Sequence, residues 1–439
     1  MIYCIKLSFG GWQVFRIMKN SRFTKQIILI IKICLLGLLI GALGGLVGAA
    51  FSYLLSSVTG LREAVPWIIL LLPLGGIITV AIYRIANMSD YGGANEIVGC
   101  IEKNKPIRAI AAPLIFVATA ITHLFGGSAG KEGAALQLGG AGASAIANAL
   151  RLKDDERTIC VKSGMSAVFA GVFGTPLTAA VFILEFKSSR KKFFLSILPS
   201  FISATVAKCV ASFLGVEGET VVIHQVADFT ILSVIKILIL SVGLALLARV
   251  MCFAFHGAQF WAKRLISNPF LRAILGSAII IAMTALVGDM RYNGSGINIV
   301  MGAAEGKADY FDFILKIIFT SVTLAAGFKG GEIVPTFSIG ASFGCVFGSI
   351  LGLSGGFSAS LGLIGLFAYA TSSPLSALLL GIEMFGFSGL PYFSIVCLIL
   401  WPLSAGKGLF DNRFFTSPIK WKKNLKDKEQ QRQKESIQV

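Results

Sequence analysis

Hydrophobic residues in this chain gather in long runs that short polar or glycine-rich segments interrupt. The longest runs cover residues 27–57, 67–83, 192–215, 229–255, 270–287 and 389–405. Each approaches or exceeds the roughly 20 residues that an α-helix needs to cross the hydrocarbon core of a bilayer. The pattern therefore predicts an all-α polytopic membrane protein. Composition agrees, because only 14% of the residues are charged and the mean hydropathy is +0.80, whereas soluble proteins contain about 25% charged residues.

The segments between these runs predict helices that are tilted or broken inside the membrane. Residues 158–187 form two short apolar pieces that are separated at Gly174-Thr175-Pro176, and each is too short to cross a bilayer squarely. Residues 87–105 form a polar, glycine-bearing interruption. Broken helices at membrane depth are tolerated where they line a cavity, because their free backbone groups need polar surroundings. We therefore expect these segments to surround a transport pathway.

Two motifs recur, in the same order, in the two halves of the chain. Gly-Lys-Glu at 130–132 recurs as Gly-Gly-Glu at 330–332. Pro-Leu-Thr-Ala opens segment 176–185, Pro-Leu-Ser-Ala opens segment 374–383, and both segments end in glutamate. Two matches in one order predict a duplicated chain whose halves meet at a transport site. The pattern leaves open whether the repeats are parallel or inverted.

The glutamates that end the second pair of repeated segments are Glu185 and Glu383. Each lies at a predicted helix end. Because ion pairs and caps are common reasons for such acids, we expect both to be capping or ion-pairing residues rather than proton carriers.

Positive charge is concentrated at the two ends of a chain whose formal net charge is +17. Positive flanks mark the cytoplasmic side of a membrane protein, so we expect both termini in the cytoplasm and the protein in the cell membrane. Attraction to anionic lipid explains this charge without a nucleic-acid partner. The predicted organisation is a basic cytoplasmic or interfacial segment, a transmembrane domain with two repeat halves, and a basic tail: 1–27, 28–410 (halves roughly 28–215 and 229–410) and 411–439.

Cysteine and histidine residues give no sign of a cofactor. The eight cysteines are dispersed and none lies in a C-x-x-C pair, and the three histidines are also far apart in the sequence. Metal sites and redox pairs usually place such residues at short, regular spacings. We therefore expect no disulfide, no metal site and no other cofactor.

A charged pair, Lys131 and Glu132, lies inside the glycine-rich stretch 126–140. The segment after Gly133 predicts the start of a helix, and the free N–H groups of a helix start favour an anion. A carboxylate at such a place can occupy the anion position itself. We therefore interpret Glu132 as a gate that is displaced or protonated when an ion enters.

This stretch also partly matches two other motifs. A phosphate loop, G-x-x-x-x-G-K-[ST], is excluded because the stretch is one residue short and has an acid where Ser or Thr is needed. Segment 126–130 does match G-x-S-x-G, which leaves an intramembrane serine hydrolase with Ser128 and His123, His224 or His256 as an alternative. Tight helix packing explains the glycines, but a purely structural protein gains nothing from charges buried at membrane depth. We expect a transporter rather than an enzyme.

Segment 127–133, Gly-Ser-Ala-Gly-Lys-Glu-Gly, resembles the G-[KR]-E-G-P signature of the CLC family of chloride channels and anion/proton antiporters. Segments 164–177 and 327–335 resemble the family's next helix pair and its G-x-F-x-P segment, in the same order. The resemblance runs from roughly residue 30 to 410. It implies a homodimer with one anion pathway per subunit, inverted repeats, and helix N-termini that meet at an anion site at the membrane midplane.

The resemblance also implies roles for individual residues. Glu132 matches the family's external gating glutamate, and Glu332 at the second helix start is a further gating or proton-carrying candidate. The implied anion-binding positions are Gly92, Gly93, Lys131, Gly133, Ala134, Ile333, Val334 and Phe410. The implied partners are a halide anion, either chloride or fluoride, together with protons and the lipid bilayer.

Three positions depart from the family's pattern. The serine of its G-S-G-I-P loop falls at Gly92, its pore tyrosine at Phe410 and its internal proton glutamate at Phe186. Without the two hydroxyl groups, backbone N–H groups become the main anion donors. Segment 327–332, Gly-Phe-Lys-Gly-Gly-Glu, resembles the family's fluoride-exporting branch more closely than its typical chloride branch. A chloride channel, a chloride/proton antiporter and a fluoride/proton antiporter all stay open.

Overall fold

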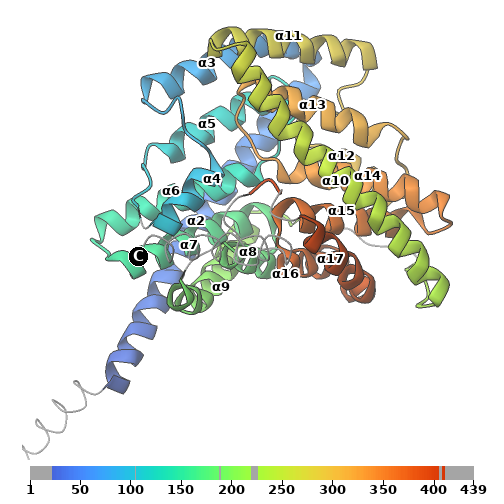
Figure 1. Cartoon of the computed structure of the whole chain (residues 1–439). Coiled ribbons are helices and arrows are strands. Elements are labelled where there is room, and N and C mark those ends of the chain that lie inside the picture. Colours follow the sequence, from blue (N-terminus) through green and yellow to red (C-terminus); the bar gives the residue numbers. More distant parts are fainter. Residues whose placement is uncertain (1–21, 104, 187–188, 219–225, 405–407, 411–439) are drawn as a thin grey trace, which may run out of the picture.

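The computed structural model describes residues 22–103, 105–186, 189–218, 226–404 and 408–410, and every named element in these ranges is a helix (Figure 1). The two terminal segments, on which the predicted cytoplasmic ends depend, lie outside the described residues. The elements are α2 (Arg22–Ala64), η1 (Pro66–Leu71), α3 (Leu72–Ile85), α4 (Ala94–Lys103), α5 (Ala111–Leu124), α6 (Glu132–Ala149), α7 (Asp154–Phe173), α8 (Pro176–Leu184), α9 (Arg190–Phe213), α10 (Ile231–Leu265), α11 (Pro269–Val287), α12 (Ile297–Ala304), α13 (Asp312–Ala326), α14 (Ile333–Ile350), α15 (Gly355–Thr371), α16 (Pro374–Phe385), η2 (Phe387–Gly389) and α17 (Leu390–Ser404).

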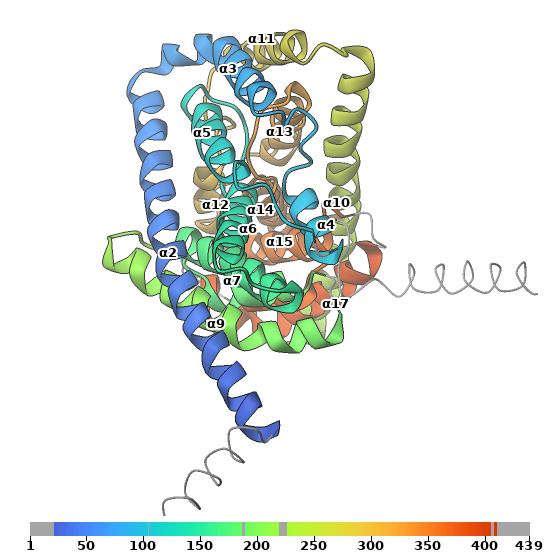
Figure 2. The same ribbon diagram turned by 90° about the vertical axis from the view of Figure 1, so that its left-hand side faces the viewer.

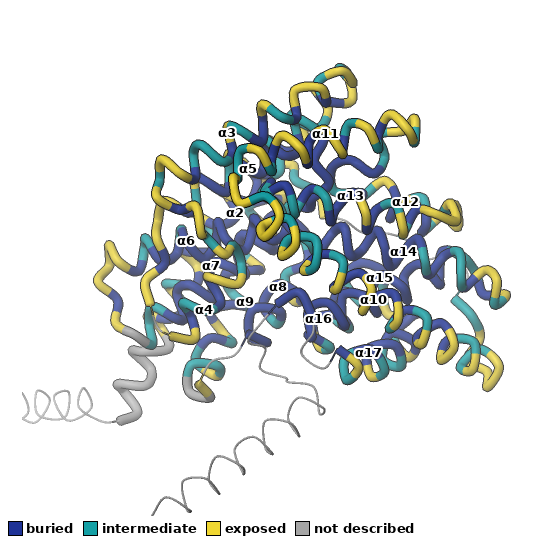
Figure 3. Tube along the Cα trace, turned by 45° about the horizontal axis from the view of Figure 1, so that its top comes forward, coloured by how far each residue is buried: buried dark blue, intermediate teal, exposed yellow. Residues whose placement is uncertain are grey.

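Within the described ranges, seven helical segments are long and apolar enough to cross a membrane. Six of them coincide with the hydrophobic runs of the sequence, which confirms a multi-pass membrane protein. The seventh, Ile333–Ile350, contains glycine, serine and threonine and is 72% buried inside the protein. Because this helix faces other helices rather than lipid, it needs small residues more than large apolar ones. Figure 3 shows α14 and α15 as a largely buried centre.

The chain is built from two halves that contain the same series of helices, α2–α9 and α10–α17. In Figure 1, α2 runs from the lower left upward to the right, and its counterpart α10 runs from the lower right upward to the left. A half-turn about the vertical of this view exchanges the two helices and reverses their direction across it, so the halves are inverted copies. Figure 2 shows these two long helices as opposite flanks, with α3 and α11 across the top and the shorter helices between them. This arrangement settles the question that the sequence repeat left open.

The predicted helix break between α7 and α8 is confirmed. Gly174 ends α7 in the left-handed conformation, with φ of 79°, and Pro176 begins α8. Proline suits the first turn of a helix because its missing N–H is not needed there. The second half repeats the arrangement, with Ser372 at φ of 52° after α15 and Pro374 at the start of α16.

Glycine pairs allow close packing of α6 on α7 and of α14 on α15. A Cβ on Gly139 of α6 would lie only 2.1 Å from the carbonyl oxygen of Gly164 on α7. In the other half, a Cβ on Gly362 of α15 would lie 2.0 Å from the carbonyl oxygen of Gly340 on α14. Without side chains between them, these backbones approach closely, as small residues allow in membranes. These contacts fix the orientation of α6 and α14 relative to the rest of each half.

Two glutamates join the halves by capping each other's helices. Glu185, directly after α8, accepts hydrogen bonds from the N–H groups of residues 375 and 376 at 3.2 and 3.3 Å, and one from the hydroxyl group of residue 376. Glu383 on α16 accepts from the N–H groups of residues 177 and 178 at 2.9 and 2.8 Å. Each carboxylate thus satisfies free N–H groups at the start of the other half's helix. The expectation that both acids cap helices is confirmed.

The reciprocal caps predict a loss of stability for Glu383→Ala. Removing the carboxylate leaves two N–H groups at the start of α8 without their acceptor, and we expect a cost of about 1–3 kcal/mol. The measurement is the thermal unfolding midpoint in detergent micelles. Glu217→Ala is the matched control, since Glu217 is an exposed acid outside the helices. Equal midpoints for the two variants would show that the caps do not stabilise the fold.

Candidate functional site

The first turns of α6 and α14 meet at a short backbone bridge between the two halves. The N–H of Gly130 donates to the carbonyl oxygen of Gly331 at 2.7 Å, and the N–H of Gly331 donates to the carbonyl oxygen of Gly130 at 2.6 Å. Each glycine lies two residues before the first residue of its helix, Glu132 of α6 or Ile333 of α14. The N-terminal ends of both helices, where positive partial charge is concentrated, therefore come together at one place.

Glycine is required at this bridge because the two backbones nearly touch. A Cβ on Gly331 would lie 2.6 Å from the backbone nitrogen of Gly133. A side chain there would push the two helix starts apart. The repeated glycines of the sequence are explained by this close approach.

Glu132 is fully buried, with 0% exposure, at the start of α6. Its Oε2 atom lies 2.5 Å from the place that a Cβ on Gly130 would take. The same point is 3.0 Å from Cδ of Pro335 and 3.3 Å from Cβ of Val334, both in the first turn of α14. The carboxylate thus lies beside both helix starts, where an anion would be stabilised.

The predicted anion-binding residues of the two helices fall in their first turns. Gly133 and Ala134 belong to α6, Ile333 and Val334 belong to α14, and all four are buried. The N–H groups of a first helical turn have no acceptor within their own helix. Lys131 is the residue before α6 and is half-buried. The structure therefore brings these five positions together.

Glu332 directly precedes α14 and faces α10 rather than its sequence neighbour Lys329. Its Oε1 atom accepts a hydrogen bond of 3.4 Å from Nε2 of Gln259, and His256 is its electrostatic neighbour on the same helix. The Lys329 ammonium instead lies 4.5 Å from the centre of the Tyr83 ring. This arrangement gives no support to a local pair between Glu332 and Lys329.

The loop before α4 approaches α6 from the other side. The N–H of Gly92 donates to Oε2 of Glu96 at 2.7 Å. The next residue, Gly93, has φ of +66° and faces the side chain of Gln137 on α6. Asn95 ties this loop to the Phe410 segment by donating from Nδ2 to the carbonyl oxygen of Leu409 at 3.2 Å. The hydrogen bond from Asn95, two residues after Gly93, thus connects the start of α4 to the residue before Phe410.

Phe410 belongs to a triad of phenylalanine rings with Phe182 and Phe186. The three ring pairs have centroid distances of 5.5, 6.0 and 6.1 Å and interplanar angles of 70, 77 and 86°. In such edge-to-face contacts the weakly positive ring edge is aimed at a neighbouring face. The triad therefore places apolar rings at the positions where the resemblance implied a tyrosine and a glutamate.

Sequence reasoning missed Lys316, which is fully buried on α13. Its ammonium donates to Oγ of Ser128 at 3.0 Å and to the carbonyl oxygens of Tyr292 and Gly294 at 3.1 and 2.9 Å. These neutral oxygens hold a buried positive charge beside the loop that leads to Glu132. The sequence does contain a signal for this residue, since Lys316 is the one charged residue in the apolar run 313–326. Charges at membrane depth usually have a function, so this lysine is a candidate.

The hydroxyl group of Ser128 contacts Thr320, at 3.0 Å, as well as Lys316. Neither contact is a histidine, and His256 lies beside Glu332 instead. Of the other two candidate bases, His123 is buried on α5 and makes its hydrogen bond with the backbone of Gly130, and His224 lies outside the described residues. The structure therefore gives the serine-hydrolase alternative no support.

Comparison with known proteins agrees with this geometry. The sequence profile of the voltage gated chloride channel family matches residues 75–400. A chloride/fluoride channel protein of Pseudomonas syringae pv. tomato is 33% identical over 85% of this chain and 84% of its own length. The crystal structure of a CLC-type fluoride/proton antiporter superimposes with a TM-score of 0.83 at 31% identity, covering 89% of this chain and 98% of that one.

A slow cyanobacterial Cl⁻/H⁺ antiporter shares the fold, with a TM-score of 0.70 at 18% identity over 85% of this chain and 94% of that one. The inverted halves, the paired helix starts and the matched profile all agree. The chain belongs to the voltage gated chloride channel (CLC) family.

Proposed function

We propose that this protein carries a halide anion across the cell membrane in exchange for protons, with Glu132 as the gate. The observation that carries the proposal is the backbone bridge between Gly130 and Gly331. It brings two helix N-termini to one place and puts the Glu132 carboxylate beside both. An anion and this carboxylate therefore compete for the same electrostatic environment.

Protonation is the step that couples the two ions. A neutral Glu132 carboxyl group loses its attraction to the helix starts, so an anion can take its place. When the anion leaves, the returning carboxyl group must release its proton, because only the carboxylate is attracted to the helix starts. Alternating occupancy by carboxylate and anion thus exchanges protons for anions, while a second acid, Glu332, is available near the start of α14.

Fluoride is the anion that we favour, with chloride as the alternative. The two relatives of highest identity described above are named for chloride and fluoride transport and for fluoride/proton antiport. Fluoride is a small, strong hydrogen-bond acceptor, and backbone N–H groups are strong, fixed donors. Side-chain hydroxyl groups are not available at Gly92 or Phe410, so the first turns of α6 and α14 supply the donors.

The test of this function is ion flux from reconstituted vesicles. Wild-type protein should release fluoride from loaded vesicles and drive protons in the opposite direction when a fluoride gradient is imposed. The same assay with chloride measures preference between the two halides. Anion flux without proton movement would support a channel and contradict the exchange mechanism.

Glu132→Gln is expected to keep anion flux and to lose proton coupling. The amide has nearly the shape of the protonated carboxyl group but cannot release a proton, so the gate stays in its neutral state. The measurements are halide efflux and the pH change outside the vesicles. The exposed Glu217→Gln serves as the control and should behave as wild type. Protons that still move against an anion gradient in Glu132→Gln would refute the gate.

Restoring a hydroxyl group at the anion pathway should tighten anion binding. Phe410→Tyr adds one oxygen atom, and one additional hydrogen bond is worth roughly 0.5–1.5 kcal/mol, or about two- to twelvefold in affinity. Titration calorimetry with fluoride and chloride measures the change. Phe343→Tyr, on α14 among the rings of Phe313 and Phe347, is the matched control. An unchanged affinity for both halides would remove Phe410 from the pathway.

Gly92→Ser is the companion change, and the backbone accepts it. Left-handed φ is found at Gly93 rather than at Gly92. A Cβ on Gly92 would meet Cβ of Glu96 at 3.5 Å, which is an ordinary contact. A left-handed backbone would strain a serine at Gly93 but not at Gly92. Gly92→Ser therefore tests whether a hydroxyl group at this position strengthens anion binding.

We also propose that the protein is a homodimer, joined through segments 176–215 and 374–405. Leu177 and Leu375 are 42% and 48% exposed on the packed pair α8 and α16. Leu375→Trp should weaken the dimer, because the larger ring clashes across an interface but is tolerated in lipid. Mass measurement in detergent should give a dimer for the wild type and more monomer for the variant. A wild type that is monomeric at moderate concentration contradicts the proposal.

A further inference from the structure

Gln137 lies on α6 one turn beyond Gly133, and only 4% of it is exposed. Its Nε2 atom donates to the carbonyl oxygen of Gly133 at 3.0 Å. Its Oε1 atom is buried and finds no hydrogen-bond donor among the described residues. Because a carbonyl oxygen can only accept, the amide nitrogen must face Gly133 and the oxygen is the atom left over. The candidate site therefore includes an unsatisfied acceptor, which favours an ordered water.

The side chain of Gln137 faces the loop before α4. Its Nε2 and Oε1 atoms lie 3.7 and 3.9 Å from the place that a Cβ on Gly93 would take. The absence of a side chain at Gly93 keeps this approach open. The adjacent N–H of Gly92 is held by the exposed carboxylate of Glu96. Polar groups thus lie between α6 and the surface, from the Gln137 amide through the Gly92 N–H group to the Glu96 carboxylate.

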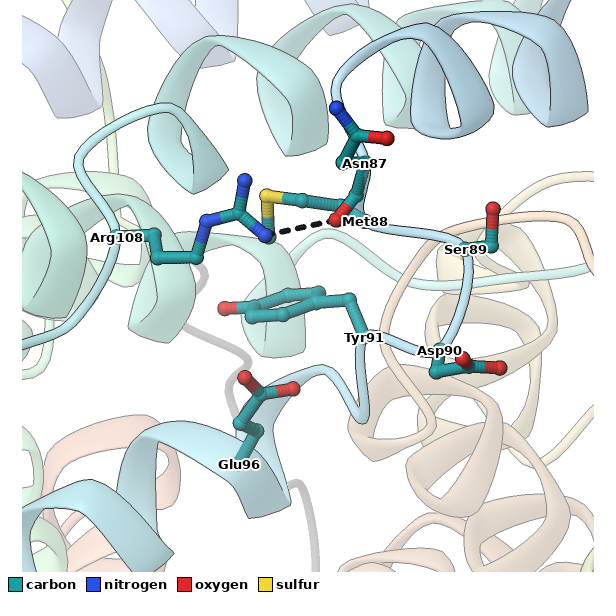
Figure 4. Close-up of a pocket in the computed structure, with 7 residues that line it drawn as sticks. All are labelled: Asn87, Met88, Ser89, Asp90, Tyr91, Glu96 and Arg108. Carbon is teal, nitrogen blue, oxygen red and sulfur yellow. Dashed lines mark hydrogen bonds between the residues drawn. The ribbon is translucent and has the colours of Figure 1, made fainter.

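A polar cavity of about 370 Å³ lies beside this acid. It is lined by Asn87, Met88, Ser89, Asp90, Tyr91, Glu96 and Arg108. Figure 4 shows the Tyr91 ring between the Arg108 guanidinium group and the Glu96 carboxylate. The hydroxyl group of Tyr91 is buried and has no partner in the described part of the chain. The cavity is large and polar enough to hold several waters, so protons can reach Glu96 and Tyr91 from the aqueous surface.

We propose that Gln137 positions a water that carries protons between Glu132 and this cavity, along Gly93 and Glu96. The inference rests on the proposed exchange of anions for protons and deepens it. Gln137 neither gains nor loses a proton. A protonated Glu132 releases its proton to the water held by Oε1, while that water passes a different proton toward the cavity. The reverse sequence reloads Glu132, so charge and atoms balance in both directions.

The groups along this route suit protons better than anions. The Oε1 atom of Gln137 and the carboxylates of Asp90 and Glu96 are acceptors, which hold water O–H groups and repel a halide. Anions instead meet the N–H groups of the helix starts. The phenylalanine triad carries no exchangeable proton, so it offers no parallel route. Protons and anions thereby reach Glu132 by different paths.

Gln137→Met is the direct test, because methionine has a similar length and lacks the acceptor oxygen. Wild type, Gln137→Met and Gln137→Glu are compared in phosphatidylcholine and phosphatidylglycerol vesicles loaded with sodium fluoride. Fluoride efflux and proton movement are recorded together, and size-exclusion chromatography confirms folding. We expect at least a tenfold lower ratio of protons to fluoride in Gln137→Met, with fluoride efflux within about threefold of wild type. Gln137→Glu keeps an acceptor oxygen and should retain proton movement.

Glu96→Gln tests the surface end of the route independently of any folding defect at Gln137. The amide oxygen can still accept from Gly92, but the proton-binding carboxylate is gone. We expect a proton-to-fluoride ratio several-fold below wild type, and the exposed Glu217→Gln should leave the ratio unchanged.

The outcomes separate this inference from the proposed function. A wild type that moves fluoride without protons overturns the exchange mechanism and the inference with it. A wild type that exchanges both ions, together with an unchanged ratio in Gln137→Met, overturns the inference alone. A folded Gln137→Met that loses fluoride and protons equally would place Gln137 in the anion pathway and would also overturn it.

Discussion

The backbone bridge between Gly130 and Gly331 is the contact on which the site depends. Its two hydrogen bonds join the halves at the points where α6 and α14 begin. Bringing two helix N-termini together concentrates positive partial charge inside a membrane protein, which is unfavourable unless a negative group lies near it. Glu132 supplies that group in this structure. The same requirement makes the place attractive to a halide whenever the carboxylate is neutral or displaced.

Several contacts further from the site hold α6 and α14 in the orientation that brings their first turns together. Glycine pairs let α6 pack on α7 and α14 pack on α15 with backbones nearly in contact. The carboxylates of Glu185 and Glu383 cap helices across the repeat interface, so each half completes the other. The inverted repeat therefore contributes twice: it brings the starts of α6 and α14 together, and it places the caps that join α8 and α16. Buried Lys316 fixes the loop before α6 through Ser128.

Protons and anions have different chemical requirements, and the two sides of Glu132 differ accordingly. The helix starts present donors, whereas Gln137 and the cavity beside Glu96 present acceptors. The phenylalanine triad presents neither. Under the proposed exchange, this separation is the physical reason why Glu132 needs no acid at Phe186 to receive protons. It also explains why a polar amide is buried on a helix that is otherwise built for close packing.

The sequence by itself determined the membrane class, six of the seven apolar helices, the helix break at Gly174 and Pro176, the repeat and the place of Glu132 at a helix start. These features follow from local chemistry, namely hydropathy, glycine and proline conformations, and a charged pair among apolar residues. Only the tertiary structure decided that the repeats are inverted, that α14 is a buried span, and that Lys316 and Gln137 lie beside the site. Those facts depend on which helix ends and side chains meet across the halves, and separation along the chain carries no information about such contacts.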